Sequence, residues 1–272
     1  MQIVADNINI MNPRVARALE SLDPEPVRTL ARECAAGGAD AVDINPGPVK
    51  KQRHRRMQLL IEAVQEAADL PLWLDSNDPE LVRIGLDLCR RTPVINGFSL
   101  EPSRLENMLP LAVETGCRIV GFLLKADGHV PPTLNERLET FQELYEQSLR
   151  SGLDPEQLIV DPISVPLMWE DGSAQGQAVL ETVAHLPQLA GHPVETVVGL
   201  SNLTSSSPPS RSRAVVEPAY LAMLSQAGLN RVMLDIRRRE AVAAVKFRRE
   251  LESGGILSWA ELDAWLNPAP PK

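Results

Sequence analysis

Short apolar runs in this sequence repeatedly end on an Asp or an Asn. Four of them, PLWLD, PVIN, QLIVD and TVVGLSN, end at Asp75, Asn96, Asp161 and Asn202. Two carboxylates and two amides suit the recognition of a flat heterocycle, because a carboxylate accepts from a ring N–H and a neighbouring amine, and an amide both donates and accepts. The alternative at each position is a residue that caps the following helix. All four on one face would favour a binding site.

The apolar runs alternate with segments whose apolar residues recur every three or four positions, a pattern typical of amphipathic helices. The predicted strands lie near residues 2–6, 40–44, 71–75, 93–96, 118–123, 157–161, 194–200 and 230–235. The predicted helices lie near 25–36, 56–68, 79–91, 103–115, 133–151, 173–187, 217–227 and 239–253, with no spare element before the tail. This alternation predicts a single-domain α/β fold, the (β/α)8 TIM barrel, in which all strands end on one face. A doubly wound open sheet is the alternative, although G-x-G-x-x-G and G-x-x-x-x-G-K-[ST] are both absent.

Two stretches fall outside this regular alternation. Residues 201–218, SNLTSSSPPSRSRAVVEP, are rich in Ser and Pro and predict a mobile loop over the strand ends. We expect the barrel to occupy residues 1–255 and residues 256–272 to form a C-terminal extension, with a frayed tail at NPAPPK.

Composition excludes several classes of protein. The 272 residues are 44% hydrophobic and 23% charged, which is typical of a globular domain. A net charge of −9 argues against nucleic acid as the main partner. We expect a cytoplasmic protein with no membrane contact, since no segment is apolar enough to span a bilayer and MQIVADNINI is not a basic leader. Because the three cysteines form no C-x-x-C and the histidines no H-E-x-x-H, no metal site is expected.

Two cationic clusters follow predicted strand ends. One is KKQRHRR, which contains Lys50 and Arg53, and the other is RRR at residues 237–239. The ordinary interpretation is the solvated start of a helix. The functional alternative is contact with a carboxylate-bearing tail or an acidic partner at the face where the strands end.

An ordered set of motifs resembles a known family. The motifs are NINI (7–10), GADAVDINPGP (38–48), LWLDSNDP (72–79), INGFSLE (95–101), DP (161–162) and VVGLSNLT (197–204). Together they resemble the pterin-binding TIM-barrel enzymes, and within them the methyltetrahydrofolate:corrinoid/iron-sulfur protein methyltransferases. The resemblance spans roughly residues 2–250.

The resemblance implies a site and a reaction. Asp75, Asn96 and Asp161 would bind the pterin ring, and Asn202 would be the catalytic residue near N5, the atom that carries the methyl group. The implied reaction is an SN2 transfer of methyl between N5 of methyltetrahydrofolate and the cobalt of a corrinoid. N5 must gain a proton or a strong hydrogen bond as its bond to carbon breaks, and the Asn202 carbonyl oxygen could accept from N5–H⁺. The candidate contacts to the folate tail or to a partner are Asn9, Asn45, Lys50, Arg53, Arg213 and Asp235.

The implied corrinoid has no evident binding motif in this sequence. A domain that binds base-off cobalamin carries D-x-H-x-x-G, whereas Asp127-Gly128-His129 continues as Val-Pro-Pro. A separate corrinoid protein would therefore have to dock on the open face of the barrel. The other implied partners are a folate, as substrate, and a second copy of the chain in a homodimer.

The sequence departs from the family pattern at two positions and leaves rival functions open. Relatives often have Glu at Asp6, and many have Asn at Glu217; neither departure touches the ring-binding set. A dihydropteroate synthase shares the ring-binding logic, but its N-x-T-x-D-S-F motif is absent here. The other rival is a non-catalytic folate-binding protein, which would not require a group at N5.

Overall fold

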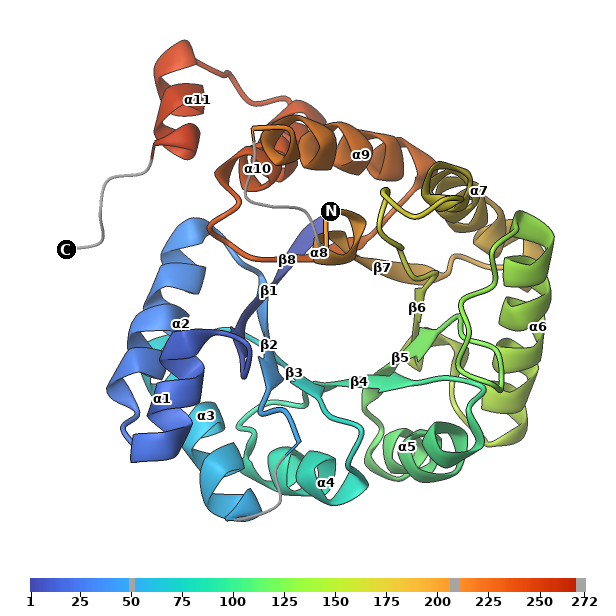
Figure 1. Cartoon of the computed structure of the whole chain (residues 1–272), viewed down its shortest axis with the longest axis horizontal. Helices are drawn as coiled ribbons and strands as arrows, with labels where there is room; N and C mark the ends of the chain where they lie inside the picture. Colours follow the sequence, from blue (N-terminus) through green and yellow to red (C-terminus); the bar gives the residue numbers. More distant parts are fainter. Residues whose placement is uncertain (49–51, 206–210, 268–272) are drawn as a thin grey trace.

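The computed structural model is a closed barrel of eight parallel strands inside a ring of helices (Figure 1). It describes residues 1–48, 52–205 and 211–267. The strands are β1 (Gln2–Asn9), β2 (Ala41–Asn45), β3 (Leu72–Asp75), β4 (Val94–Phe98), β5 (Arg118–Phe122), β6 (Leu158–Asp161), β7 (Glu195–Gly199) and β8 (Arg231–Leu234). Each strand pairs with the next, and β8 closes against β1. The predicted TIM barrel is confirmed, and the open doubly wound sheet is excluded.

Helices connect successive strands across the outside of the barrel. They are α1 (Pro13–Ser21), α2 (Glu25–Gly37), α3 (Arg53–Ala67), α4 (Pro79–Leu88), α5 (Pro102–Thr115), α6 (Leu134–Arg150), α7 (Gly172–Ala190), α8 (Leu200–Leu203), α9 (Arg213–Ala227), α10 (Arg239–Ser253) and α11 (Trp259–Leu266), with a 3-10 helix η1 (Pro155–Gln157). None of these described helices is long and apolar enough to cross a membrane.

The expectation of no spare element before the tail was wrong, because α1, η1 and α8 were not predicted. Helix α1 has a local cause: the Asn12 side chain accepts from the Arg14 N–H, and Pro13 occupies the first turn. It is short and buries only Val15, Ala18 and Leu19, which gives a weak periodic signal.

The stretch 201–218 is more regular than predicted. Leu200–Leu203 forms α8, and α9 begins at Arg213 rather than near residue 217, so a loop over the whole stretch was wrong. Burial of Leu200 and Leu203 explains α8, since packing overrides the weak helix preference of the Ser-rich neighbours. Residues 206–210 lie outside the described residues.

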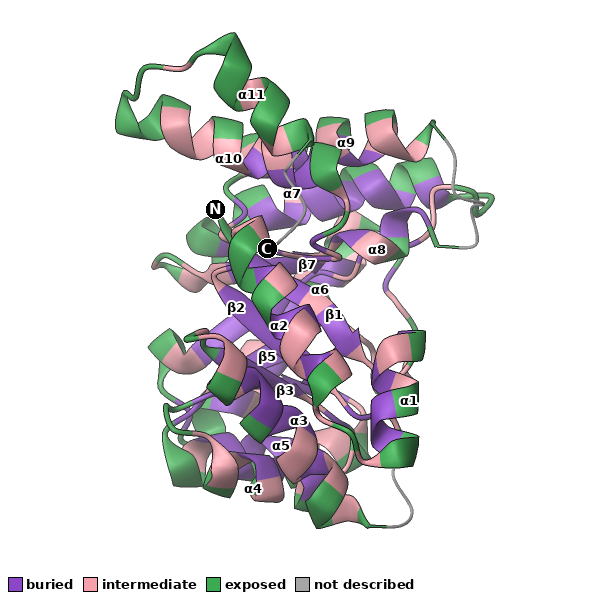
Figure 2. Ribbon diagram, turned by 90° about the vertical axis from the view of Figure 1, so that its left-hand side faces the viewer, coloured by how far each residue is buried: buried purple, intermediate pink, exposed green. Residues whose placement is uncertain are grey.

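The barrel interior has a middle layer of apolar side chains. Val4, Ala41, Trp73, Val120, Ile159 and Val197 form one buried cluster, and each comes from a different strand. Only the interior can bring side chains from six strands together in this way. Larger apolar clusters pack the outer faces of the strands against the helices, and Figure 2 shows this buried layer beneath exposed helix surfaces. Side chains two positions later on each strand therefore point inward, one layer closer to the strand ends.

Helix α11 lies outside the helical ring (Figure 1). It begins with a capping box between Ser258 and Glu261, and none of its residues is buried. This placement supports the proposed division between a barrel over residues 1–255 and an extension over residues 256–272. The NPAPPK tail falls almost entirely outside the described residues.

Candidate functional site

Polar side chains form the layer at the carboxyl ends of the strands. Asp43, Asp75 and Asp161 each lie two residues beyond a member of the inward-pointing middle layer, on β2, β3 and β6. Asn96 on β4 lies two residues beyond Val94, which packs against that layer. Asp75 and Asn96 are direct neighbours in the register between β3 and β4. Because every strand of the barrel is parallel, these side chains share one face. The sequence predicted this for Asp75, Asn96 and Asp161 but not for Asp43.

Hydrogen bonds between adjacent strands and across one intervening strand fix this polar layer. Asn96 Nδ2 donates to Asp43 Oδ1 over 3.0 Å, and both residues are buried. Asn45 Nδ2 donates to Asp75 Oδ2 over 2.5 Å, and Asn45 Oδ1 accepts from the Gly47 N–H. The amides of Asn96 and Asn45 are therefore oriented, because one N–H of each donates to a carboxylate.

Burial makes ionisation of these carboxyl groups costly. It is the main cause that raises the pKa of Asp75 to about 6. For Asp43, burial and the neighbouring charge of Asp75 together raise the pKa well above its ordinary value, against the hydrogen bond from Asn96. A ligand that offers N–H donors to this layer would stabilise the ionised carboxylates.

Asp161 is held by the segment that follows β6. Its Oδ1 accepts from the Ile163 N–H over 2.7 Å, and burial raises its pKa to about 7. Beside it, the fully buried Arg137 donates to the Pro162 and Ile163 carbonyls and, over 3.2 Å, to Gln175 Oε1. Burial also lowers the pKa of Arg137 to about 10. This arginine fixes the loop after β6 and supplies positive potential near Asp161.

Asn202 lies on α8 directly after β7, and not at the end of a strand as the sequence suggested. The strand stops at Gly199, and the next residues turn into the helix. The Asn202 side chain is exposed on the same face as the carboxylate layer. The four residues chosen from the sequence thus all lie at the carboxyl-terminal face of the barrel.

A second polar group connects β1, α8 and β8. Asn7 Nδ2 donates to Asp235 Oδ1 over 2.5 Å, while Arg237 forms an ion pair with Asp235. Burial opposes ionisation of Asp235, but hydrogen bonds from Arg237 outweigh it and lower the pKa of Asp235. Next to this pair, burial and the charge of Asp235 raise the pKa of Asp6 to about 6, and Ser201 Oγ lies 3.4 Å from Asp6 Oδ2.

The remaining predicted contacts are distributed along the same rim. Asn9 donates to the Asp6 carbonyl and accepts from the Met11 N–H, so it orders the turn after β1. Arg53 forms ion pairs with Asp78 and Glu80, which join the starts of α3 and α4. Arg213 Nη2 donates to the Thr204 carbonyl over 3.3 Å. Lys50 lies outside the described residues.

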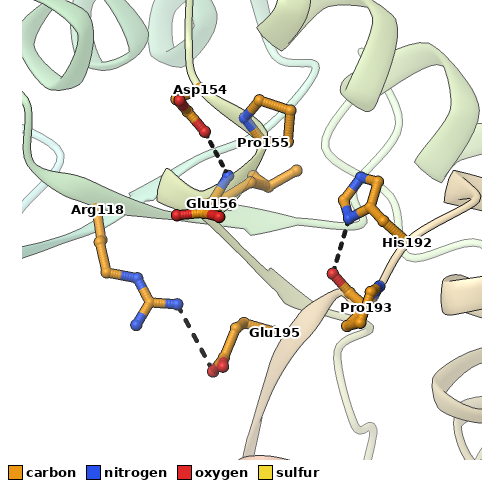
Figure 3. A pocket seen from close by; sticks show the side chains of 8 residues that line it. Arg118, Asp154, Pro155, Glu156, His192, Pro193 and Glu195 are labelled. Atoms are coloured by element: carbon orange, nitrogen blue, oxygen red, sulfur yellow. Dashed lines mark hydrogen bonds and ion pairs between the residues drawn. The ribbon is translucent and has the colours of Figure 1, made fainter.

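Two pockets differ in their relation to this layer. One of about 550 Å³ is lined by Asn45, Asp75 and neighbouring residues of the loops after β2 and β3. A larger one, of about 740 Å³, lies at the opposite face, where β5, β6 and β7 begin (Figure 3). Arg118, Glu195 and His192 line the larger pocket, which contains none of the predicted site residues. Of these two pockets, the smaller one is lined by the predicted site residues Asn45 and Asp75, whereas residues at the amino-terminal face of such barrels generally serve stability.

Sequence reasoning missed several residues of this face. Asp43 is two positions before Asn45 on the same strand, so strand alternation could have placed it in the polar layer. Arg137 is far from any strand end in the sequence and gave no comparable signal. Over the described ranges, no group of three or more His, Cys, Asp or Glu residues could hold a metal ion.

Comparison with known proteins identifies the family. Residues 6–235 match the family described as pterin binding enzyme, which is most of the chain. The chain belongs to the pterin binding enzymes. The resemblance drawn from the sequence motifs is thereby confirmed. The polar layer lies at the carboxyl-terminal face, where TIM-barrel enzymes generally carry their active sites.

Curated relatives of this pterin binding enzyme include methyltransferases. The chain is 24% identical over 249 residues to the methylcorrinoid:tetrahydrofolate methyltransferase of Eubacterium limosum, covering 90% of this chain and 89% of that protein. It is also 24% identical over 238 residues to the methionine synthase of Mycobacterium leprae, but spans only 19% of that longer protein.

Solved structures share the fold at low identity. Dihydropteroate synthase from Xanthomonas albilineans in complex with 7,8-dihydropteroate superposes with a TM-score of 0.66 at 20% identity, covering 92% of this chain and 93% of the other. Dihydropteroate synthase from Thermus thermophilus gives 0.63 at 22% identity, covering 90% and 93%. At these identities the structures support the fold alone.

Proposed function

We propose that this pterin binding enzyme moves the N5-methyl group between methyltetrahydrofolate and the cobalt of a separate corrinoid protein. The observation that carries the proposal is the convergence of buried Asn96 and Asp161 with half-buried Asp75 in one polar layer, with Asn202 exposed on the same face. A relative that covers nearly the whole chain and is named a methylcorrinoid:tetrahydrofolate methyltransferase supports it.

Three side chains retain acceptor atoms for a pterin ring. Asp75 uses Oδ2, and Asp161 uses Oδ1, in the hydrogen bonds observed within the described residues. Asn96 uses its amino group and keeps its carbonyl oxygen as an acceptor. A pterin presents a ring N–H next to an exocyclic amine, so an ionised carboxylate can accept both. Binding of these donors would offset the burial that disfavours the carboxylate form.

The methyl step requires N5 to become a good leaving group. The cobalt electron pair attacks the methyl carbon, the carbon–N5 bond breaks, and its electrons remain on N5, which must therefore carry a proton or an equivalent hydrogen bond. Asn202 is neutral, so it cannot supply that proton, but its carbonyl oxygen can accept from N5–H⁺. A positioned interaction of this kind contributes about 3 kcal/mol to the transition state. Alignment of carbon with cobalt contributes through proximity and orientation.

The partner would approach the open face of the barrel. Asn202 and the Asp235–Arg237 pair lie on that face, and the sequence lacks the base-off cobalamin motif. We therefore assign the corrinoid to a second protein and the folate to this chain as its substrate. A homodimer remains a prediction, which light scattering of the purified chain would test.

The rival functions make different products. A dihydropteroate synthase would join a pterin diphosphate to p-aminobenzoate, but the sequence motifs for that reaction are absent and the likeness to solved synthases concerns the fold. A non-catalytic protein would bind folate without turnover, and the exposed Asn202 amide would then have no chemical role.

Three assays separate the methyltransferase, the synthase and the non-catalytic folate-binding protein. The purified chain is mixed with methyltetrahydrofolate and a Co(I) corrinoid protein, and methyl–cobalt absorbance is followed. Formation of methyl–cobalt supports the proposal. Folate binding without transfer would establish the non-catalytic function, and production of dihydropteroate from its two precursors would establish the synthase.

A further inference from the structure

Asn202 depends on the backbone of α8 for its position. Its side chain is exposed, and among the described residues no side-chain hydrogen bond holds it. The Asn202 carbonyl accepts from the Thr204 and Ser205 N–H groups, which closes the short helix. A four-residue helix has little stability of its own, so outside contacts must fix the place where Asn202 is presented.

Several contacts anchor α8. Leu200 and Leu203 are buried, and the Leu203 carbonyl accepts from the Leu167 N–H over 3.0 Å. On the other side, the Thr204 hydroxyl donates to the carboxylate of Glu217, which belongs to α9. Thr204 is only two residues from Asn202, and its hydrogen bond to Glu217 is buried, whereas the contact of 3.4 Å from Ser201 Oγ to Asp6 Oδ2 is partly buried.

Burial and ion pairs fix the Glu217 side chain in place. Its side chain is 3% exposed, and Arg238 in the loop after β8 forms an ion pair with it. Arg213 Nε lies 3.7 Å from the same carboxylate, and Arg213 Nη2 donates to the Thr204 carbonyl. A buried carboxylate costs several kcal/mol to desolvate unless cations and hydrogen bonds offset it, as they do here. The Glu217 carboxylate therefore connects α9 to the end of α8 and to the loop after β8.

We infer that Glu217 is a positioning residue, acting through Thr204 to hold the Asn202 amide at the reacting nitrogen. This role rests on the proposed methyl transfer, and it gives a function to a residue that departs from the family pattern. Glu217 contacts no ring-binding residue described above, so its loss should displace Asn202 without emptying the pterin site. The signature is a fall in transfer rate with little change in folate affinity.

The experiment combines variants of Glu217 and Thr204 with Asn202→Ala. Thr204→Val keeps the shape and removes the hydroxyl, while Glu217→Gln keeps the size and removes the charge. The matched control is Thr182→Val, which removes the hydroxyl of another buried threonine, bonded only to the Ala178 carbonyl within α7. Each variant is assayed for single-turnover methyl transfer, folate dissociation constant and circular dichroism.

Thr204→Val should lower the transfer rate about tenfold or more, since small misplacements of a catalytic group are costly, with folate affinity within about twofold. Thr182→Val should leave the rate unchanged. In the Asn202→Ala background, Thr204→Val should lower the rate by less than about twofold, because residues that act through one another are not additive. Glu217→Gln should follow the same pattern, which provides a second variant if either protein folds poorly.

Two results would overturn the assignment. Additive losses in the Asn202→Ala background, or equal losses of rate and folate affinity, would show that Glu217 and Thr204 support the barrel and not Asn202. Either result, obtained with an active wild-type protein, overturns the positioning role and leaves the proposed function standing. A wild-type chain that transfers no methyl group overturns the proposed function itself, so the two failures are distinguishable.

Discussion

Replacing Asp161 by Asn tests whether the ionised Asp161 carboxylate lowers the free energy of unfolding. Asp161 is buried, and burial raises its pKa from 3.8 to about 7. Because the folded-state pKa is above the unfolded one, the native state binds the proton more tightly. The stabilisation that comes from this tighter proton binding is fully present below pH 3.8 and is lost as the pH rises through about 7.

The size of the effect follows from the pKa interval. One pH unit corresponds to about 1.4 kcal/mol, so ionising Asp161 in the folded barrel destabilises it by about 4 kcal/mol at high pH. By the same linkage, the loss of unfolding free energy relative to low pH is about 2 kcal/mol at pH 5 and about 4 kcal/mol at pH 8. Asn has the same shape, keeps the acceptor for the Ile163 N–H and never ionises, so it removes the pH-dependent part. The attraction of ionised Asp161 to Arg137 is already contained in the folded-state pKa, so it adds no separate contribution.

Urea unfolding at pH 5 and pH 8 measures the difference. The stability of Asp161→Asn relative to wild type should increase by about 2 to 3 kcal/mol from pH 5 to pH 8. Asp263→Asn, on the exposed helix α11, is the matched control and should show no such trend. A relative stability that is the same at both pH values would show that the protein stabilises the Asp161 anion and would refute the reasoning. Pterin affinity should fall in Asp161→Asn at both pH values.

The other predictions concern the site and the limits of the barrel. Asn202→Ala should lower methyl transfer about 100-fold with folate affinity within a few-fold, because its interaction is strongest in the transition state; equal losses in both measurements would contradict this role. Asn96→Ala should cost about 1 to 3 kcal/mol in urea unfolding, since it removes the amide that donates to buried Asp43; an unchanged midpoint would show that water replaces it. Gly97→Ala should prevent accumulation of folded protein, because its Cβ would lie 2.2 Å from a backbone carbonyl oxygen of β5; normal circular dichroism and melting would refute the clash. A chain that ends at residue 255 should melt within a few degrees of the full chain, because α11 buries no residue; loss of cooperative unfolding would place α11 in the barrel's core.

Much of the barrel could be predicted from local sequence. Apolar runs of strand length, separated by amphipathic helices, gave all eight strands near their observed positions. The elements that were missed are short: α1 and α8 have few residues with which to show periodicity, and α8 depends on burial of Leu200 and Leu203. Local pattern is informative where an element buries a whole face and uninformative where a distant contact holds it.

The candidate site shows the same division. The sequence by itself placed Asp75 and Asp161 at the ends of parallel strands and Asn96 on a third, although β4 continues to Phe98, and parallel strands in a closed barrel must end together. Only the tertiary structure decided that the Asn96 amide donates to Asp43, that Arg137 is buried beside Asp161, and that Glu217 reaches the segment of Asn202. Strand position follows from the order of residues along the chain. Hydrogen bonds and burial between residues far apart in that order depend on how the strands and helices pack, which no single segment encodes.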